Sequence, residues 1–124
     1  MELEKLTEKV IGCAIAVHRA LGPGFLEGIY ERALLVELRH HKVPFSFQKE
    51  RPVFYRGEEV GFQRYDILVE DCLVLELKAT KAIEDIHFAQ VRSYLKALGL
   101  RHGLLLNFAT MPLTIKRVIF DPDS

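Results

Sequence analysis

Two carboxylates and a lysine near the middle of the chain have types and a spacing that suit chemistry on phosphate. They are Asp66, Glu76 and Lys78, and the last two end an apolar run. Side chains alternate faces along a strand, so Glu76 and Lys78 share one face. Carboxylate oxygens bind a hard divalent cation such as Mg²⁺, which polarises a phosphoryl oxygen and lowers the pKa of bound water. The trio therefore suits phosphodiester hydrolysis, and a cross-strand ion pair at a sheet margin also fits the spacing.

Whether Asp66 joins that face depends on the length of the connection that follows its strand. Residues paired across an antiparallel ladder point to the same face. An odd number of connecting residues, such as 70–72, places Asp66 opposite Glu76, whereas a two-residue turn places it opposite Leu75 and directs it away. We therefore predict a three-residue loop or a bulge after Val69.

Two further pairs have helical spacing. Glu27 and Tyr30 are three residues apart, and Gln90 and Tyr94 are four apart, so each pair lies on one helix face. Glu27 can add a carboxylate to the metal site, or it is a first-turn glutamate that favours the helix dipole. Gln90 can meet a phosphate or base, orient Lys78, or be an ordinary surface amide. The nearby basic residues can meet phosphates or form a solvated surface: Arg64, Lys78, Lys81 and Arg92.

The elements that must position these residues follow from apolar periodicity. Helical spacing predicts a helix over residues 4–21, a second over 25–41 after Gly22-Pro23-Gly24, and a third from about 85 to 98 that ends at Gly99. The remaining segments read as extended: 45–49, 52–55, 60–69, 72–78, 103–108 and 114–120. We predict an α/β (α+β) fold with the order α-α-β-β-β-α-β-β and a mixed sheet.

Composition limits the classes of function. The 124 residues suit a single domain over 1–124, and 17 basic residues balance 17 acidic ones, so net charge gives no argument for nucleic-acid binding. Cys13 and Cys72 lie in apolar runs and fit no metal spacing, which favours small buried side chains in a reducing, cytoplasmic compartment. No apolar run approaches the ~20 residues of a membrane span, and the first nine residues do not resemble a signal peptide.

The motifs resemble the GxxExxY domain family, a branch of the PD-(D/E)xK nuclease superfamily. Its naming motif stands at Gly24, Glu27 and Tyr30, and the superfamily pattern at Asp66, Glu76 and Lys78. The family's Arg-x-Asp stands at 64–66, with Tyr65 in place of the superfamily's proline. Related exonucleases carry the glutamine and tyrosine found here at Gln90 and Tyr94, and the strand end found at Asn107 and Phe108. The resemblance runs from about residue 10 to 118.

This resemblance implies a restriction-endonuclease-like mixed central sheet flanked by helices and a nuclease that depends on Mg²⁺ or Mn²⁺. The catalytic residues would be Asp66, Glu76, Lys78, Glu27 and Gln90. The metal ligands would be Asp66, Glu76, the Leu77 carbonyl, Glu27 and His18. The substrate would meet Tyr30, Arg64 and Tyr94. If His18 is a ligand, its nitrogen would favour Mn²⁺. Alternatively, His18 is a helix-end histidine that interacts with the C-terminal helix dipole.

The rival interpretation is a nuclease-derived binding or assembly module with little or no catalysis, since one fold can serve several roles. The final strand, 114–120, is expected to leave an open edge suited to self-pairing. A homodimer is therefore expected under both interpretations. The resemblance implies that the partner is a nucleic acid, with DNA favoured over RNA. No membrane partner is expected.

Overall fold

The computed structural model describes residues 2–47 and 50–123, and it consists of three helices and seven strands in those ranges. The first half contains α1 (Leu3–Leu21), α2 (Glu27–His40), β1 (Phe45–Phe47), β2 (Glu50–Tyr55) and β3 (Glu58–Arg64). The second half contains β4 (Ile67–Val69), β5 (Leu73–Lys78), α3 (Asp85–Leu98), β6 (His102–Asn107) and β7 (Thr114–Ile119). The predicted helices are confirmed, with α2 beginning two residues later than expected.

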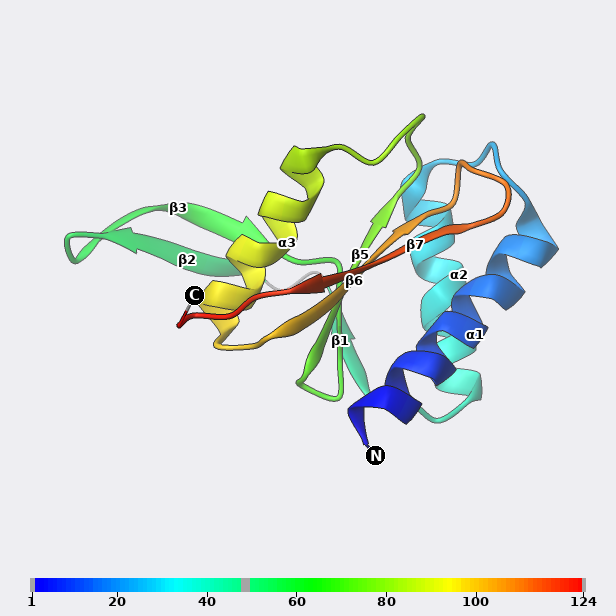
Figure 1. The fold of residues 1–124 in the computed structure, drawn as a ribbon, viewed down its shortest axis with the longest axis horizontal. Coiled ribbons are helices and arrows are strands. Elements are labelled where there is room, and N and C mark those ends of the chain that lie inside the picture. Colours follow the sequence, from blue (N-terminus) through cyan, green and yellow to red (C-terminus); the bar gives the residue numbers. More distant parts are fainter. Residues whose placement is uncertain (1, 48–49, 124) are drawn as a thin grey trace.

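Five of the strands form one mixed sheet in the order β1-β4-β5-β6-β7. The β5–β6 pair is parallel and the other pairs are antiparallel. The β5–β6 connection contains α3, as a parallel crossover requires. In Figure 1, α1 and α2 lie on one side of this sheet and α3 on the other. The expected mixed sheet flanked by helices is therefore confirmed.

The prediction of one strand over residues 60–69 is wrong. Those residues divide into β3 and β4, which belong to different sheets, because β2 and β3 form a separate two-stranded hairpin. The hairpin extends away from the central sheet in Figure 1. Residues in β3 are mostly exposed, whereas all three of β4 are buried. Five strands instead of three consequently precede α3, since alternation within a strand does not show which sheet the strand enters.

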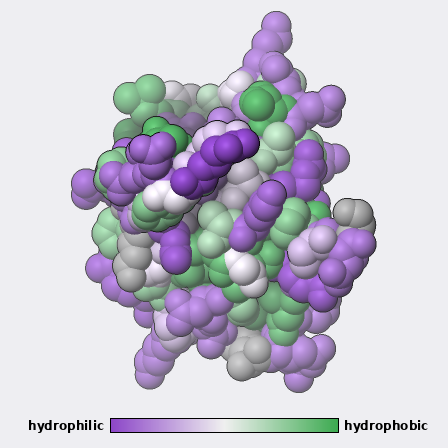
Figure 2. Space-filling model, turned by 90° about the vertical axis from the view of Figure 1, so that its left-hand side faces the viewer, coloured by the Kyte–Doolittle hydropathy of each residue, from purple (hydrophilic) through white to green (hydrophobic). Residues whose placement is uncertain are grey.

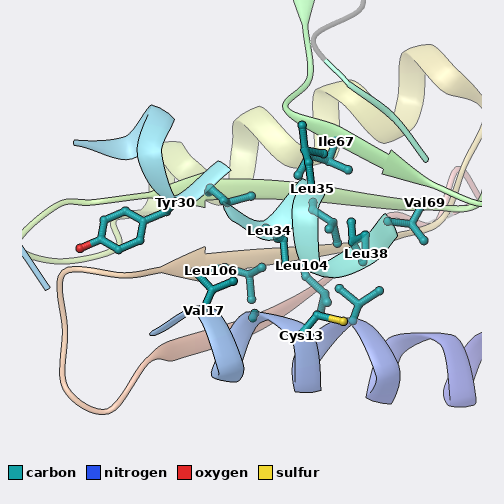
Figure 3. Packing of buried hydrophobic residues seen from close by; sticks show 14 of the residues in the cluster. Cys13, Val17, Tyr30, Leu34, Leu35, Leu38, Ile67, Val69, Leu104 and Leu106 are labelled. Atoms are coloured by element: carbon teal, nitrogen blue, oxygen red, sulfur yellow. The ribbon is translucent and has the colours of Figure 1, made fainter. Parts of the chain in front are cut away.

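The two faces of the central sheet carry separate cores. Leu73, Leu75 and Leu77 pack with α1 and α2 in the larger cluster, part of which Figure 3 shows from close by. Val74 packs with Val91 and Leu95 of α3 in the smaller cluster. Because faces alternate along β5, Glu76 and Lys78 follow Val74 onto the α3 side. The predicted shared face of these two residues is therefore the face that α3 covers.

The ends of α3 are defined by local hydrogen bonds. At the start, the Glu84 backbone N–H donates to Nδ1 of His87 at 2.9 Å. At the end, Gly99 adopts the left-handed conformation with φ 71° and ψ 29°, a C-terminal cap that glycine forms without steric cost. The helix between these ends carries Gln90 and Tyr94 over the sheet.

Candidate metal centre

The connection between β4 and β5 has the predicted odd length. Residues 70–72 separate the strands, and both Glu70 and Asp71 have positive φ. The ladder pairs Ile67 with Leu75 and Val69 with Leu73. The next position of that register places Asp66 opposite Glu76, so the sequence-based prediction of a three-residue loop is confirmed.

Asp66 bonds to the backbone of β5 beyond the last paired residue of β4. Its Oδ2 accepts a hydrogen bond from the Leu77 N–H at 2.8 Å. The N–H and C=O of one strand residue point to the same side of the strand. The Leu77 carbonyl therefore lies on the side of β5 where Asp66 lies, as its predicted role in metal binding requires.

Glu76 is buried beside Asp66, with 4% of its surface exposed. Burial is the largest cause that raises the pKa of Glu76 to about 9, followed by its hydrogen bond with Asp66 and the charge of Asp66, while Lys78 opposes the shift. When two carboxyl groups lie close together in a poorly solvated site, ionisation of both is energetically unfavourable. A divalent cation would stabilise both charged forms, so this oxygen donor set fits Mg²⁺ or Mn²⁺.

Helix α3 contributes both of its predicted residues to this face. The Lys78 Nζ donates to Oε1 of Gln90 across 3.5 Å, a long hydrogen bond. Burial, the charges of Glu76 and Asp66, and a hydrogen bond with Glu76 all raise the pKa of Tyr94. Tyr94 therefore remains a neutral phenol, which is suited to orienting Glu76.

Glu27 lies at the margin of the carboxylate pair. It accepts a hydrogen bond from the Ala79 backbone, and its pKa is raised by burial and then by the charge of Asp66, with Lys78 opposing. Within the described residues, Glu27, Asp66 and Glu76 are not a group whose ligand oxygens all lie within 4.8 Å of one another. In this structure Glu27 is thus an outer carboxylate beside a closer pair.

Tyr30 is buried and hydrogen-bonded to the loop that precedes Glu27. Its hydroxyl donates to the Gly22 carbonyl at 2.6 Å and accepts from the Phe25 N–H at 3.1 Å. Its ring stacks on Phe108 with centroids 4.7 Å apart and is closed off from solvent. The predicted contact of Tyr30 with substrate therefore has no support in the geometry, and the residue instead positions the loop that leads into α2.

His18 and Arg64 are held elsewhere. His18 is buried, and its Nε2 donates to the Thr110 carbonyl at 2.9 Å. The structure thereby ties His18 to the β6–β7 connection rather than to the carboxylate pair. Arg64 is exposed at the end of β3, where its ladder partner is Glu50 of the hairpin.

Asn107 has a structural role that sequence reasoning left unassigned. It is fully buried at the end of β6. Its side chain donates to the Thr80 carbonyl at 2.9 Å and accepts from the Thr80 N–H at 3.1 Å. These bonds fasten the segment that follows Lys78. The sequence signal for this role was an asparagine at the end of an apolar strand. A buried amide needs hydrogen-bond partners for both its oxygen and its nitrogen.

A solved structure resembles this chain in fold. The crystal structure of SSO0001 matches with a TM-score of 0.59 and 16% identity, covering 75% of this chain and 49% of that one. The chain thus spans about half the length of SSO0001, and the likeness concerns the fold. None of the curated proteins is detectably similar in sequence, and no helix in the described ranges has the length and apolar character needed to cross a bilayer.

A family model described as the PD-(D/E)XK nuclease superfamily matches residues 4–118. The match includes both strands of the carboxylate pair and the whole of α3. Members of this superfamily typically use divalent metals, in accord with the oxygen donors found here. The chain belongs to the PD-(D/E)XK nuclease superfamily.

Proposed function

We propose that this protein is a nuclease that hydrolyses phosphodiester bonds with Mg²⁺ or Mn²⁺. The observation that carries the proposal is the register of β4 and β5, which sets Asp66 against a buried Glu76. These two carboxylates and the Leu77 carbonyl would hold the ion, with Glu27 at the margin. The ion would act as a Lewis acid on phosphate and lower the pKa of a bound water.

The residues around the pair have distinct proposed roles. Lys78 orients the attacking water or stabilises charge on the phosphate, and its contact with Gln90 keeps the ammonium over the sheet. Tyr94 orients Glu76 through their hydrogen bond. Superfamily membership supports a nucleic-acid substrate, and we propose DNA before RNA, with Arg64 at the end of β3 meeting a distant phosphate.

Metal binding is tested by thermal stabilisation. A cation at 100 times its dissociation constant stabilises the folded state by about 2.7 kcal/mol. We expect Mn²⁺ to raise the melting temperature of the wild type and not that of Asp66→Ala. Glu59→Gln, an acid on the exposed hairpin, is the matched control and should respond as the wild type does. Equal responses of wild type and Asp66→Ala would contradict the metal site.

Activity needs a separate assay. We expect Mn²⁺-dependent cleavage of single-stranded or double-stranded DNA, with RNA cut more weakly. Lys78→Ala should lower the rate at least 100-fold, in the range of a lost transition-state donor, while Mn²⁺ still stabilises the variant. Metal stabilisation without cleavage of any substrate would instead favour the binding or assembly module.

The exposed hairpin is the observation that favours this second candidate. Val53, Phe54, Tyr55, Val60 and Phe62 are large apolar side chains that it exposes to solvent. Figure 2 views the molecule from the hairpin side and shows apolar surface among hydrophilic side chains. Together with the edge position of β7, this surface supports the proposed homodimer. Assignment to the GxxExxY branch and a cytoplasmic location remain proposals, the latter supported by two free cysteines.

A further inference from the structure

A second group of metal-ligating side chains lies between α1 and α2. Cys13 of α1 and Glu37 and His41 at the end of α2 offer three ligand atoms that all lie within 4.8 Å of one another. Nε2 of His41 and Oε2 of Glu37 are 3.4 Å apart. Ligand atoms around a tetrahedral Zn²⁺ are separated by roughly 3.3–3.8 Å, given bond lengths of about 2.0–2.3 Å. The three side chains thus need only small adjustments to surround one ion.

The backbone around His41 places its ring in a defined position. His41 is the C-cap residue of α2, and its N–H donates to the Glu37 carbonyl at 3.0 Å. The chain then reverses through Lys42, which has φ 58°, and the Val43 N–H returns to the Leu38 carbonyl at 2.9 Å. This cap anchors His41 one turn above Glu37 on the face that meets α1.

The chemistry of the donors favours a thiophilic cation. Cys13 is 2% exposed and belongs to the packed cluster drawn in Figure 3. Burial is the main cause that raises the pKa of the Cys13 thiol, the charge of Glu37 raises it further, and Lys9 opposes the shift. The metal-free thiol therefore keeps its proton, which a bound cation would have to displace. One thiolate, one carboxylate and one neutral imidazole balance the charge of a divalent ion. Thiolate and imidazole suit Zn²⁺ much better than Mg²⁺.

We propose that Cys13, Glu37 and His41 bind a divalent cation of the Zn²⁺ type, which fastens α1 to α2. Binding forms a bond from Sγ to the ion, and the thiol proton passes to solvent without any redox step. Side chains of His41 and Glu37 are 45% and 32% exposed, so water can reach the ion and complete its coordination. Glu27 begins α2 and His41 caps its end, 14 positions later, which is roughly 21 Å along a helix. The ion is therefore structural and remote from the carboxylate pair.

Co²⁺ is the probe for this site, because a thiolate ligand gives it a charge-transfer band that carboxylates do not give. Titration of the metal-free wild type should produce this band and visible tetrahedral bands, saturating at about one equivalent. Cys13→Ser should abolish the thiolate band. His41→Gln, a change at an exposed side chain, should weaken Co²⁺ binding at least 10-fold, as loss of a ligand requires.

Matched controls separate this site from other thiols, histidines and carboxylates. Cys72→Ser, His40→Gln and Asp66→Ala should all keep the thiolate band and its affinity. A wild type without the band, or a band that survives unchanged in His41→Gln, would overturn the proposal. Loss of the band in Cys72→Ser would also overturn it, since the sulfur would then be the wrong one.

Thermal stabilisation by Zn²⁺ gives an independent readout when measured in the Asp66→Ala background. Zn²⁺ should raise the melting temperature of Asp66→Ala and leave that of Asp66→Ala/His41→Gln unchanged. Because Asp66 is absent from both proteins, this result does not depend on the nuclease proposal. Equal stabilisation of both proteins, or of neither, would count against the site.

Discussion

At the scale of single residues, Glu76 makes stability depend on pH in an unusual direction. An exposed glutamate titrates near 4.5, whereas burial and Asp66 raise the pKa of Glu76 to about 9. Between these values the folded metal-free protein holds a proton that the unfolded chain has lost. The contribution of Glu76 to the free energy of unfolding is therefore highest below about pH 4.5 and falls as pH rises to about 9.

We predict that Glu76→Gln removes much of this slope. A neutral amide keeps the shape of the side chain and does not ionise, so at least about 1.4 kcal/mol of pH dependence, the equivalent of one pKa unit, should disappear. The measurement is urea unfolding in EDTA between pH 5 and about 9, with Glu59→Gln as the control. Parallel profiles for Glu76→Gln and the wild type would show that Glu76 ionises normally.

At the scale of elements, the distance between α3 and the sheet depends on Gly103. A Cβ at this position would lie 2.8 Å from Cγ1 of Val91 and 3.2 Å from the Val74 carbonyl oxygen. We predict that Gly103→Ala pushes α3 outward and lowers the free energy of unfolding by about 1–3 kcal/mol, the usual cost of overpacking.

The double variant Gly103→Ala/Val91→Ala tests the cause. Removal of the Val91 methyl groups relieves the closer of the two contacts, so the double variant should be more stable than the sum of the single changes predicts. The carbonyl of Val74 remains close, so recovery should be partial. Additive effects in urea unfolding would mean that Gly103→Ala acts through the strand itself rather than through α3.

Register was predictable from the sequence, whereas sheet membership was not. Side chains alternate between the two faces of β5, and Glu76 lies on a known face. Asp66 can lie opposite Glu76 only if the number of residues that connect β4 to β5 is odd. Nothing in residues 60–69 marks the change from the hairpin to the central sheet, because exposed and buried strands can share one alternating pattern. The sequence analysis also did not predict the group formed by Cys13, Glu37 and His41. Its members come from different helices, and spacing along the sequence does not show how two helices pack.

At the scale of the whole molecule, the hairpin of β2 and β3 exposes large apolar side chains to solvent. The side chains of Phe54 and Phe62 are 61% and 64% exposed. We predict that Phe54→Ser and Phe62→Ser change the free energy of unfolding by at most about 0.5 kcal/mol, as exposed substitutions do.

The same two variants should weaken the proposed homodimer. Sedimentation velocity should show a shift toward monomer for each, whereas Val36→Ser, an equally exposed apolar residue on α2, should behave as the wild type. A dimer that persists in both phenylalanine variants would place association elsewhere, with the edge of β7 as the next surface to test.

The hydrogen bond from the Leu77 N–H to Asp66 turns one backbone amide into a spectroscopic reporter. Binding of the proposed cation would draw charge from the Asp66 carboxylate, which would weaken that bond and move the amide proton resonance of Leu77 upfield. A single nuclear magnetic resonance peak would then follow cation loading without label, substrate or turnover. A backbone amide of β5 would in this way report cation binding at the neighbouring carboxylates.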